Sequence, residues 1–179
     1  MLNIEESALA LIDVQSRLVE VVDRRERVMP NILRLVKGCQ VLGIPVLPTV
    51  QVPEKLGPMP ADLVQALGDI NPISKAVFSA LREPAFLLAL RQTGCKQVIL
   101  AGIEAHVCVL QTGLDLLDAG YSVHVLSDGV FSRAAENHQV GLDRLSHAGA
   151  TVSSVEMVLF ELMRTSNHPQ FRTISKLIK

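Results

Sequence analysis

Cysteine, net charge and long apolar runs are all scarce in this chain of 179 residues, and each scarcity excludes a class of protein. Only three cysteines occur, with no C-x-x-C pair, so the sequence carries no disulfide framework and suits a reducing compartment. Seventeen basic and eighteen acidic side chains give a net charge of -1, which does not indicate a nucleic-acid partner. No uncharged apolar run reaches the roughly 18 residues of a membrane helix, and the acidic N-terminus is unlike a signal peptide. We therefore expect a cytoplasmic protein that binds neither nucleic acid nor a membrane.

Motifs for metals and phosphates are also missing. The sequence has no His-x-His and no His-Glu-x-x-His pattern. The turn expected after residue 101 has one glycine, Gly102, rather than the several that cradle a phosphate. We therefore predict no metal site and no cofactor.

Apolar residues are abundant and follow two alternating patterns. They make up 49% of the chain against 20% charged residues, which excludes disorder, and the length fits a single domain over residues 1–179. Short apolar runs predict strands over residues 8–12, 44–50, 97–101, 121–126 and 150–153. Helical spacing predicts helices over residues 28–42, 61–67, 84–93, 106–119, 136–147 and 157–163; residues 53–60 are expected to be a loop, and residues 72–75 are too few to assign. This alternation predicts an α/β, Rossmann-like fold whose mostly parallel sheet has helices on both faces.

Three places at the carboxyl ends of the expected strands could carry chemistry, because that edge is where doubly wound sheets bind ligands. Asp13 ends the first strand and is either a base or metal ligand, or the cap of the following loop. Cys108 begins a helix, where the dipole and free N–H groups favour a thiolate of lowered pKa; the alternative is a small buried hydrophobe. Asp128, after the strand over residues 121–126, is either a cap or a second carboxylate of the pocket.

The remaining cysteines and histidines point less clearly to chemistry. Cys39, in an amphipathic helix, and Cys95, in a turn, are interpreted as structural. His106 lies two residues from Cys108, and side chains at that spacing on a helix do not face each other. We therefore do not expect a Cys–His pair there.

Five segments resemble the isochorismatase-like cysteine hydrolases, and they occur in the family's order along residues 8–163. The first three contain Asp13, Lys75 and Cys108 in that order, and two further stretches follow. The five segments are Ala10–Gln15, Ile73–Ser79, Gly102–Thr112, Ser127–Arg133 and Ser154–Leu162. The resemblance implies a six-stranded parallel sheet flanked by helices. It also implies a homo-oligomer, a dimer or larger, because members of the small branch of this family commonly assemble in that way.

The resemblance also implies a role for each residue. Cys108 would be the nucleophile, Asp13 would accept its proton, and Lys75 would supply the positive charge that keeps both ionised. A cis peptide bond is expected at Ile103–Glu104, where it would turn the N–H groups of Glu104 and Cys108 toward an oxyanion. Without the resemblance, Lys75 would be interpreted as a surface lysine.

The substrate class follows from two differences between this chain and other members of the family. Residues 51–60 contain no histidine, whereas nicotinamidases of this family carry an Asp-x-His metal motif there, and isochorismatases proper lack the cysteine. The sequence therefore favours a metal-free cysteine hydrolase that cleaves a C–N bond of a small amide or carbamoyl-type substrate through a thioester. The nearest candidates to line its small pocket are Gln15, Leu18 and Phe78.

Two other classes of function remain for comparison. A phosphoryl acceptor at Asp13 would need a second Asp where Gln15 stands, or in a receiver domain a lysine where Ser127 and Asp128 stand. The other alternative is a catalytically silent, oligomeric binding or interaction module on the same fold. The presence of all three chemical groups, Asp13, Lys75 and Cys108, argues against this alternative.

Overall fold

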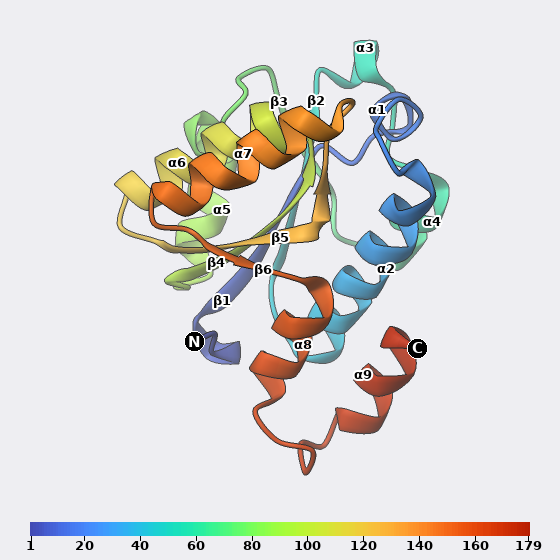
Figure 1. Ribbon diagram of the computed structural model, residues 1–179, viewed down its shortest axis with the longest axis vertical. Helices are drawn as coiled ribbons and strands as arrows, with labels where there is room; N and C mark the ends of the chain where they lie inside the picture. Colours follow the sequence, from blue (N-terminus) through green and yellow to red (C-terminus); the bar gives the residue numbers. More distant parts are fainter.

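The computed structural model describes residues 1–179, and its centre is one parallel sheet of six strands (Figure 1). The strand order is β3-β2-β1-β4-β5-β6, so the chain starts in the middle of the sheet, fills one side and then the other. The strands are β1 (Ser7–Ile12), β2 (Val46–Gln51), β3 (Ile73–Lys75), β4 (Gln97–Ile103), β5 (Ser122–Phe131) and β6 (Thr151–Ser153). The predicted six-stranded, parallel α/β fold is confirmed.

Helices cover both faces of this sheet, as its strand pattern predicts. One face is covered by α2 (Arg25–Val41), α4 (Ala61–Leu67), α8 (Val155–Met163) and α9 (Phe171–Ile178). The other is covered by α5 (Pro84–Gln92), α6 (Leu110–Asp118) and α7 (Ala135–His147). Two short helices, α1 (Ser16–Val19) and α3 (Pro53–Leu56), lie at the edge where the strands end (Figure 1).

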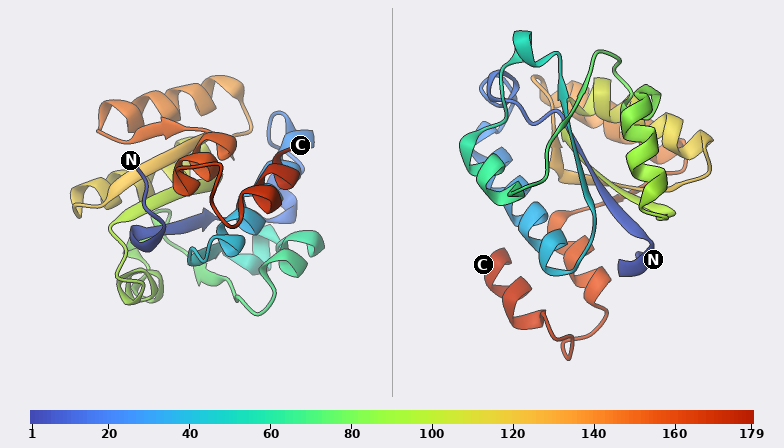
Figure 2. Two further views of the ribbon diagram at one scale, coloured as in Figure 1. Left: turned by 90° about the horizontal axis from the view of Figure 1, so that it is seen from below. Right: turned by 180° about the vertical axis from the view of Figure 1, so that it is seen from behind.

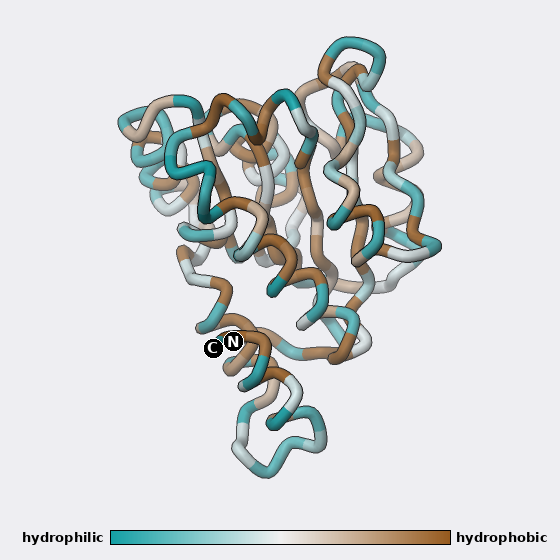
Figure 3. Tube along the Cα trace, turned by 90° about the vertical axis from the view of Figure 1, so that its right-hand side faces the viewer, coloured by the Kyte–Doolittle hydropathy of each residue, from teal (hydrophilic) through white to brown (hydrophobic).

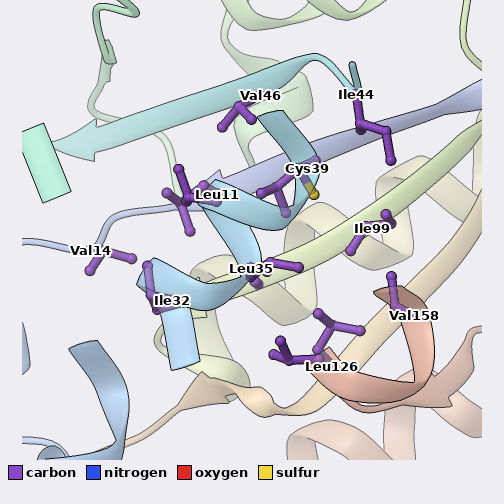
Figure 4. Close-up of a cluster of buried hydrophobic side chains, with 14 of the residues drawn as sticks. Leu11, Val14, Ile32, Leu35, Cys39, Ile44, Val46, Ile99, Leu126 and Val158 are labelled. Carbon is purple, nitrogen blue, oxygen red and sulfur yellow. The ribbon is translucent and has the colours of Figure 1, made fainter. Parts of the chain in front are cut away.

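The two layers enclose separate apolar cores. Alternate residues of β1 point to opposite faces, so Leu9 and Leu11 pack in the core beneath α2, while Ala8 and Ala10 pack in the core beneath α5 and α6. Figure 4 shows Leu11 of β1 meeting Ile32 and Leu35 of α2 in the first core. The hydropathy colouring of Figure 3 agrees, with long hydrophobic stretches along the interior strands. No helix combines the length and apolar composition needed to cross a membrane.

Several boundaries differ from the sequence prediction for physical reasons. β5 continues to Phe131, five residues past the predicted end, because its pairing with β4 slips at Leu100/Gly102 and then resumes. The predicted loop over residues 53–60 contains the single turn α3. Helix α9 was not predicted; it lies beside α2 (Figure 2), and the side chain of Arg34 donates a hydrogen bond to Leu177 O at 3.2 Å. Its apolar residues Phe171, Ile174, Leu177 and Ile178 follow helical spacing, so the sequence carried a signal for this helix that the prediction did not use.

The sheet brings the ends of β1 and β4 together unusually closely. Ile12 pairs with Gly102, whose φ of 121° is a conformation that side chains disfavour. A Cβ built on Gly102 would lie 1.9 Å from Ile12 O, so only glycine fits. This contact lies at the switch point of the strand order, directly before Asp13 in one strand and Ile103 in the other.

Candidate active site

Asp13 follows β1 in a left-handed conformation, with φ of 48°, which aspartate tolerates better than most residues. Its side chain is fully buried. Thr49 of β2 holds it on two sides: Thr49 Oγ1 donates to Asp13 Oδ1 at 2.7 Å and accepts from Asp13 N at 3.2 Å. The neighbouring strand thus fixes the orientation of the carboxylate.

Lys75, the last residue of β3, reaches this carboxylate across β2. Its Nζ lies 2.6 Å from Asp13 Oδ2, and both side chains are 0% exposed. The same ammonium donates to Gln51 Oε1 at 2.6 Å and to Val77 O and Phe78 O at 3.2 Å each. A buried charge needs partners of this kind, because burial without them is strongly unfavourable.

Cys108 lies in a π-helical turn (Ala105–Val109) between β4 and α6, and only 7% of the residue is exposed. Asp13 and Lys75 are the two charged groups that act on the pKa of its thiol. Burial and the negative charge of Asp13 raise the pKa of the thiol to about 12, while the ammonium of Lys75 acts in the opposite direction. The predicted lowering of this pKa is therefore wrong: burial and a nearby carboxylate outweigh the opposite effect of the lysine.

The structure thus brings Asp13, Lys75 and Cys108 together from three strand ends. At neutral pH the thiol keeps its proton, and the charges of a carboxylate and an ammonium both act on it. A carboxylate in this position can take the proton when the sulfur attacks, and the ammonium balances the charge that forms.

The Ile103–Glu104 peptide bond, directly before the turn, is cis. The Glu104 carboxylate accepts hydrogen bonds from the backbone N (3.2 Å) and the Nε (2.9 Å) of Arg133, which anchors the turn to the end of β5. The oxyanion role of this peptide stays a prediction.

The three residues predicted to line the pocket have different surroundings. Gln15 is fully buried, and its amide is already bonded to Gln51 N, Gln51 O and Gly57 O. Leu18 is half-buried in α1, and Phe78 is 52% exposed beside the lysine. Contact of these side chains with a substrate stays a prediction.

Two other sequence questions are answered by hydrogen bonds. Asp128 Oδ1 accepts from Val155 N at 2.8 Å, so this carboxylate caps the start of α8. The Nδ1 of His106 lies 2.9 Å from Ser132 Oγ, which agrees with the expectation that His106 does not pair with Cys108. Nowhere in the chain do three or more His, Cys, Asp or Glu side chains gather as a metal site would require.

Sequence reasoning missed Thr49, Gln51 and Thr112, all of them buried. The only available signal was a polar residue within an otherwise apolar strand or helix face, which does not reveal its partner. A polar cavity of about 760 Å³ was also missed; it lies between the start of α2 and the end of β5, and Asp128 lines it. Asp13, Lys75 and Cys108 are not among its lining residues.

The family model described as the isochorismatase domain matches residues 7–157, which include all three site residues. The chain belongs to the isochorismatase family. The hydrolase fold predicted for it is therefore confirmed at the level of the family.

Relatives of this isochorismatase-family chain match over nearly its whole length. A secreted isochorismatase effector of Phytophthora sojae is 38% identical over 97% of this chain and 84% of its own. Isochorismatase domain-containing protein 2 of Danio rerio is 34% identical over 99% of this chain and 89% of its own. A solved structure called MAR1 ribonuclease, from Caenorhabditis elegans, is 35% identical with a TM-score of 0.93 and covers 99% of this chain and 91% of its own. An Escherichia coli protein described as an octameric hydrolase of unknown specificity is 26% identical, with a TM-score of 0.88 over 98% of this chain and 94% of its own.

Proposed function

We propose that this protein is a cysteine hydrolase that cleaves a C–N bond of a small amide or carbamoyl-type substrate. One observation carries the proposal: the charges that act on the Cys108 thiol belong to a buried carboxylate and a buried ammonium that lie 2.6 Å apart. A protonated thiol beside an ionised carboxylate is the starting state that nucleophilic attack with general-base assistance requires.

The reaction proceeds in two balanced halves. Cys108 Sγ attacks the carbonyl carbon and transfers its proton to Asp13; the C–N bond then breaks, and the amine leaves with that proton. Asp13 next removes a proton from water, the resulting hydroxide attacks the thioester carbon, and the C–S bond breaks as the proton returns to sulfur. Lys75 keeps its charge throughout and stabilises Asp13 and the sulfur while each is negative.

Stabilisation of the oxyanion is assigned, by analogy with the family, to the N–H groups of Glu104 and Cys108. The anchoring of Glu104 by Arg133, directly before the turn that holds Cys108, supports this assignment. Such donors act most strongly where water is excluded, and Cys108 is buried. The low exposure of Cys108 also favours a compact acyl donor, and Gln15, Leu18 and Phe78 are the candidates to contact it.

The experiment that tests the proposal is a search for the thioester. The protein is mixed with a panel of small primary amides, ureas and carbamates, and each reaction is quenched with acid for intact-mass analysis. We expect a mass increase on Cys108 and release of ammonia or amine with one of these compounds, and neither in Cys108→Ala. Release of product that persists in Cys108→Ala would contradict the mechanism.

The alternative is a catalytically silent, oligomeric binding module, and the raised thiol pKa and 7% exposure of Cys108 are the observations that favour it. Iodoacetamide separates the two functions under native conditions. A hydrolase site should be alkylated at Cys108 faster than at Cys39 and Cys95, since the ammonium of Lys75 favours the thiolate of Cys108. Equal, slow labelling of all three cysteines would favour the module.

Two further expectations belong to this proposal. The octameric E. coli relative supports a homo-oligomer, which light scattering on the purified protein tests. Three free cysteines support a reducing compartment such as the cytoplasm, although the Phytophthora relative is called secreted. RNA belongs in the substrate panel because the nematode relative is called a ribonuclease; a net charge of -1 leads us to expect no cleavage.

A further inference from the structure

Thr112 is a fully buried polar residue in the first turn of α6 that the proposed chemistry does not use. Its hydroxyl donates to Cys108 O at 2.6 Å, a bond to the residue four positions earlier that threonine often makes in helices. The same hydroxyl accepts a hydrogen bond from Ala80 N at 2.9 Å, and Ala80 is 32 residues away in the chain. The second bond joins the nucleophile's turn to a distant segment.

That segment is the loop that holds the lysine. After Lys75 the chain passes Val77 and Phe78, whose carbonyls both accept hydrogen bonds from Lys75 Nζ, and then reaches Ala80. The ammonium therefore holds the near end of the loop, and the hydroxyl of Thr112 holds the far end. Cys108 and the loop around Lys75 are connected through one buried oxygen atom.

We propose that Thr112 is a positioning residue that sets the Cys108 thiol relative to the Lys75 ammonium. A role of Thr112 in catalysis rests on the proposed function, but the effect of Thr112 on the position of the thiol relative to the ammonium does not. A buried N–H that loses its acceptor is costly, so without the hydroxyl the loop is expected to move until Ala80 N finds another partner. Asp13 after β1 and Lys75 from β3 are the charged groups that act on the thiol. Movement of the loop therefore changes how strongly Lys75 lowers the pKa of Cys108.

The chain contains a matched control for this bond. Arg82, two residues after Ala80, forms an exposed ion pair with Asp115 of α6, with Nε to Oδ2 at 2.7 Å. The pair joins the same two segments as Thr112 but has no hydrogen bond to the Cys108 turn. Asp115→Asn weakens this connection and leaves the buried hydroxyl in place.

The test measures how strongly Lys75 influences Cys108 with and without the hydroxyl. Iodoacetamide alkylation of Cys108, resolved by peptide mass, is timed at pH 8.5 in four proteins: wild type, Lys75→Met, Thr112→Val and the double variant. We expect Lys75→Met to slow alkylation in the wild-type background and the size of that effect to fall at least fivefold in the Thr112→Val background. A change in the accessibility of the thiol alone cancels in this ratio.

Two further variants decide whether the hydroxyl is responsible. Thr112→Ser, which keeps it, should restore the Lys75 effect to within twofold of wild type, and Asp115→Asn should leave it unchanged. An equal Lys75 effect with and without Thr112→Val overturns the proposal. Because no substrate is needed, this result is independent of whether an amide is hydrolysed.

A measurement on the unaltered protein covers the case in which Thr112→Val fails to fold. Hydrogen exchange of the Ala80 amide should be at least 100-fold slower than that of an unstructured peptide of the same sequence, since its acceptor is a buried hydroxyl. Exchange of Ala80 at the unstructured rate would overturn the proposal without any substitution.

Discussion

Cys39 and Cys108 lie in different regions of the molecule and have similarly raised thiol pKa values, both to about 12. Around Cys39 the cause is burial alone: the side chain lies in α2 among Leu11, Leu35 and Ile44 (Figure 4). Around Cys108 burial acts together with Asp13 and against Lys75. A shifted pKa therefore does not identify a nucleophile. The distinguishing feature is a neighbouring group that can take the proton and another that tolerates the charge.

The largest expected difference between the two regions is in hydrolysis. Cys108→Ala should reduce turnover of any amide substrate by at least about 1,000-fold, because no covalent intermediate can form. Cys39→Ala should leave turnover within twofold of wild type and lower the free energy of unfolding by about 1 kcal/mol through a small cavity. Steady-state kinetics and urea unfolding of the two variants measure both quantities. Loss of turnover in a stably folded Cys39→Ala would break the comparison.

The next largest effect concerns the buried ion pair. Lys75→Met should lower the free energy of unfolding by about 3–5 kcal/mol, because it leaves the Asp13 carboxylate buried without its partner. The double variant Asp13→Asn/Lys75→Met should recover part of that loss, since neither charge remains. Urea unfolding at pH 7 measures both changes. A loss in the free energy of unfolding below about 1 kcal/mol in Lys75→Met would show that water reaches Asp13 and Lys75, which would set this region apart from the dry surroundings of Cys39.

Alkaline pH should affect the two thiols alike. Below the ordinary thiol value of 9.0, folded and unfolded chains both keep the protons, and stability does not depend on these groups. Between about pH 9 and 12 the unfolded chain releases protons that the folded chain retains, so stability falls by about 1.4 kcal/mol per pH unit for each thiol. Urea unfolding at pH 8, 9 and 10 measures the slope. Cys39→Ala and Cys108→Ala should each remove one thiol's share of it.

The smallest predicted effect separates the thiols again. Asp13→Asn removes the negative charge that raises the pKa of Cys108 and leaves Cys39 untouched. Alkylation of Cys108 by iodoacetamide at pH 8.5 should therefore become faster, because a lower pKa leaves more of the thiol as thiolate. The rate at Cys39 should not change. An unaltered rate at Cys108 would mean that Asp13 does not act on this sulfur.

The sequence predicted the layers of the fold well, because alternating apolar runs and helical spacing are local patterns. The carboxyl ends of β1 and β4 drew attention to Asp13 and Cys108 by that reasoning alone. Lys75 needed the family resemblance, since β3 has only three residues and carries too short a pattern to assign. α9 was missed although Phe171, Ile174, Leu177 and Ile178 give it an apolar face at helical spacing, which packs into the core beneath α2.

The supporting residues could not be predicted because their partners are remote in the chain. Thr49 acts on Asp13 from 36 residues away, and Gln51 acts on Lys75 from 24. The error in the Cys108 pKa has the same origin. A helix start is visible in the sequence, but the burial of the turn and the approach of a carboxylate are properties of the folded chain.

The close approach at Gly102 has a consequence for anyone who wishes to redesign this protein. A Cβ there would lie 1.9 Å from Ile12 O, so β1 and β4 are in very close contact at the point from which Asp13 and the Cys108 turn both extend. A larger substrate cannot be accommodated by moving these two strands apart. Room for it has to come from a neighbouring segment such as residues 53–60, where Gly57 O accepts a hydrogen bond from Gln15, and that segment is the place to randomise in a library for altered specificity.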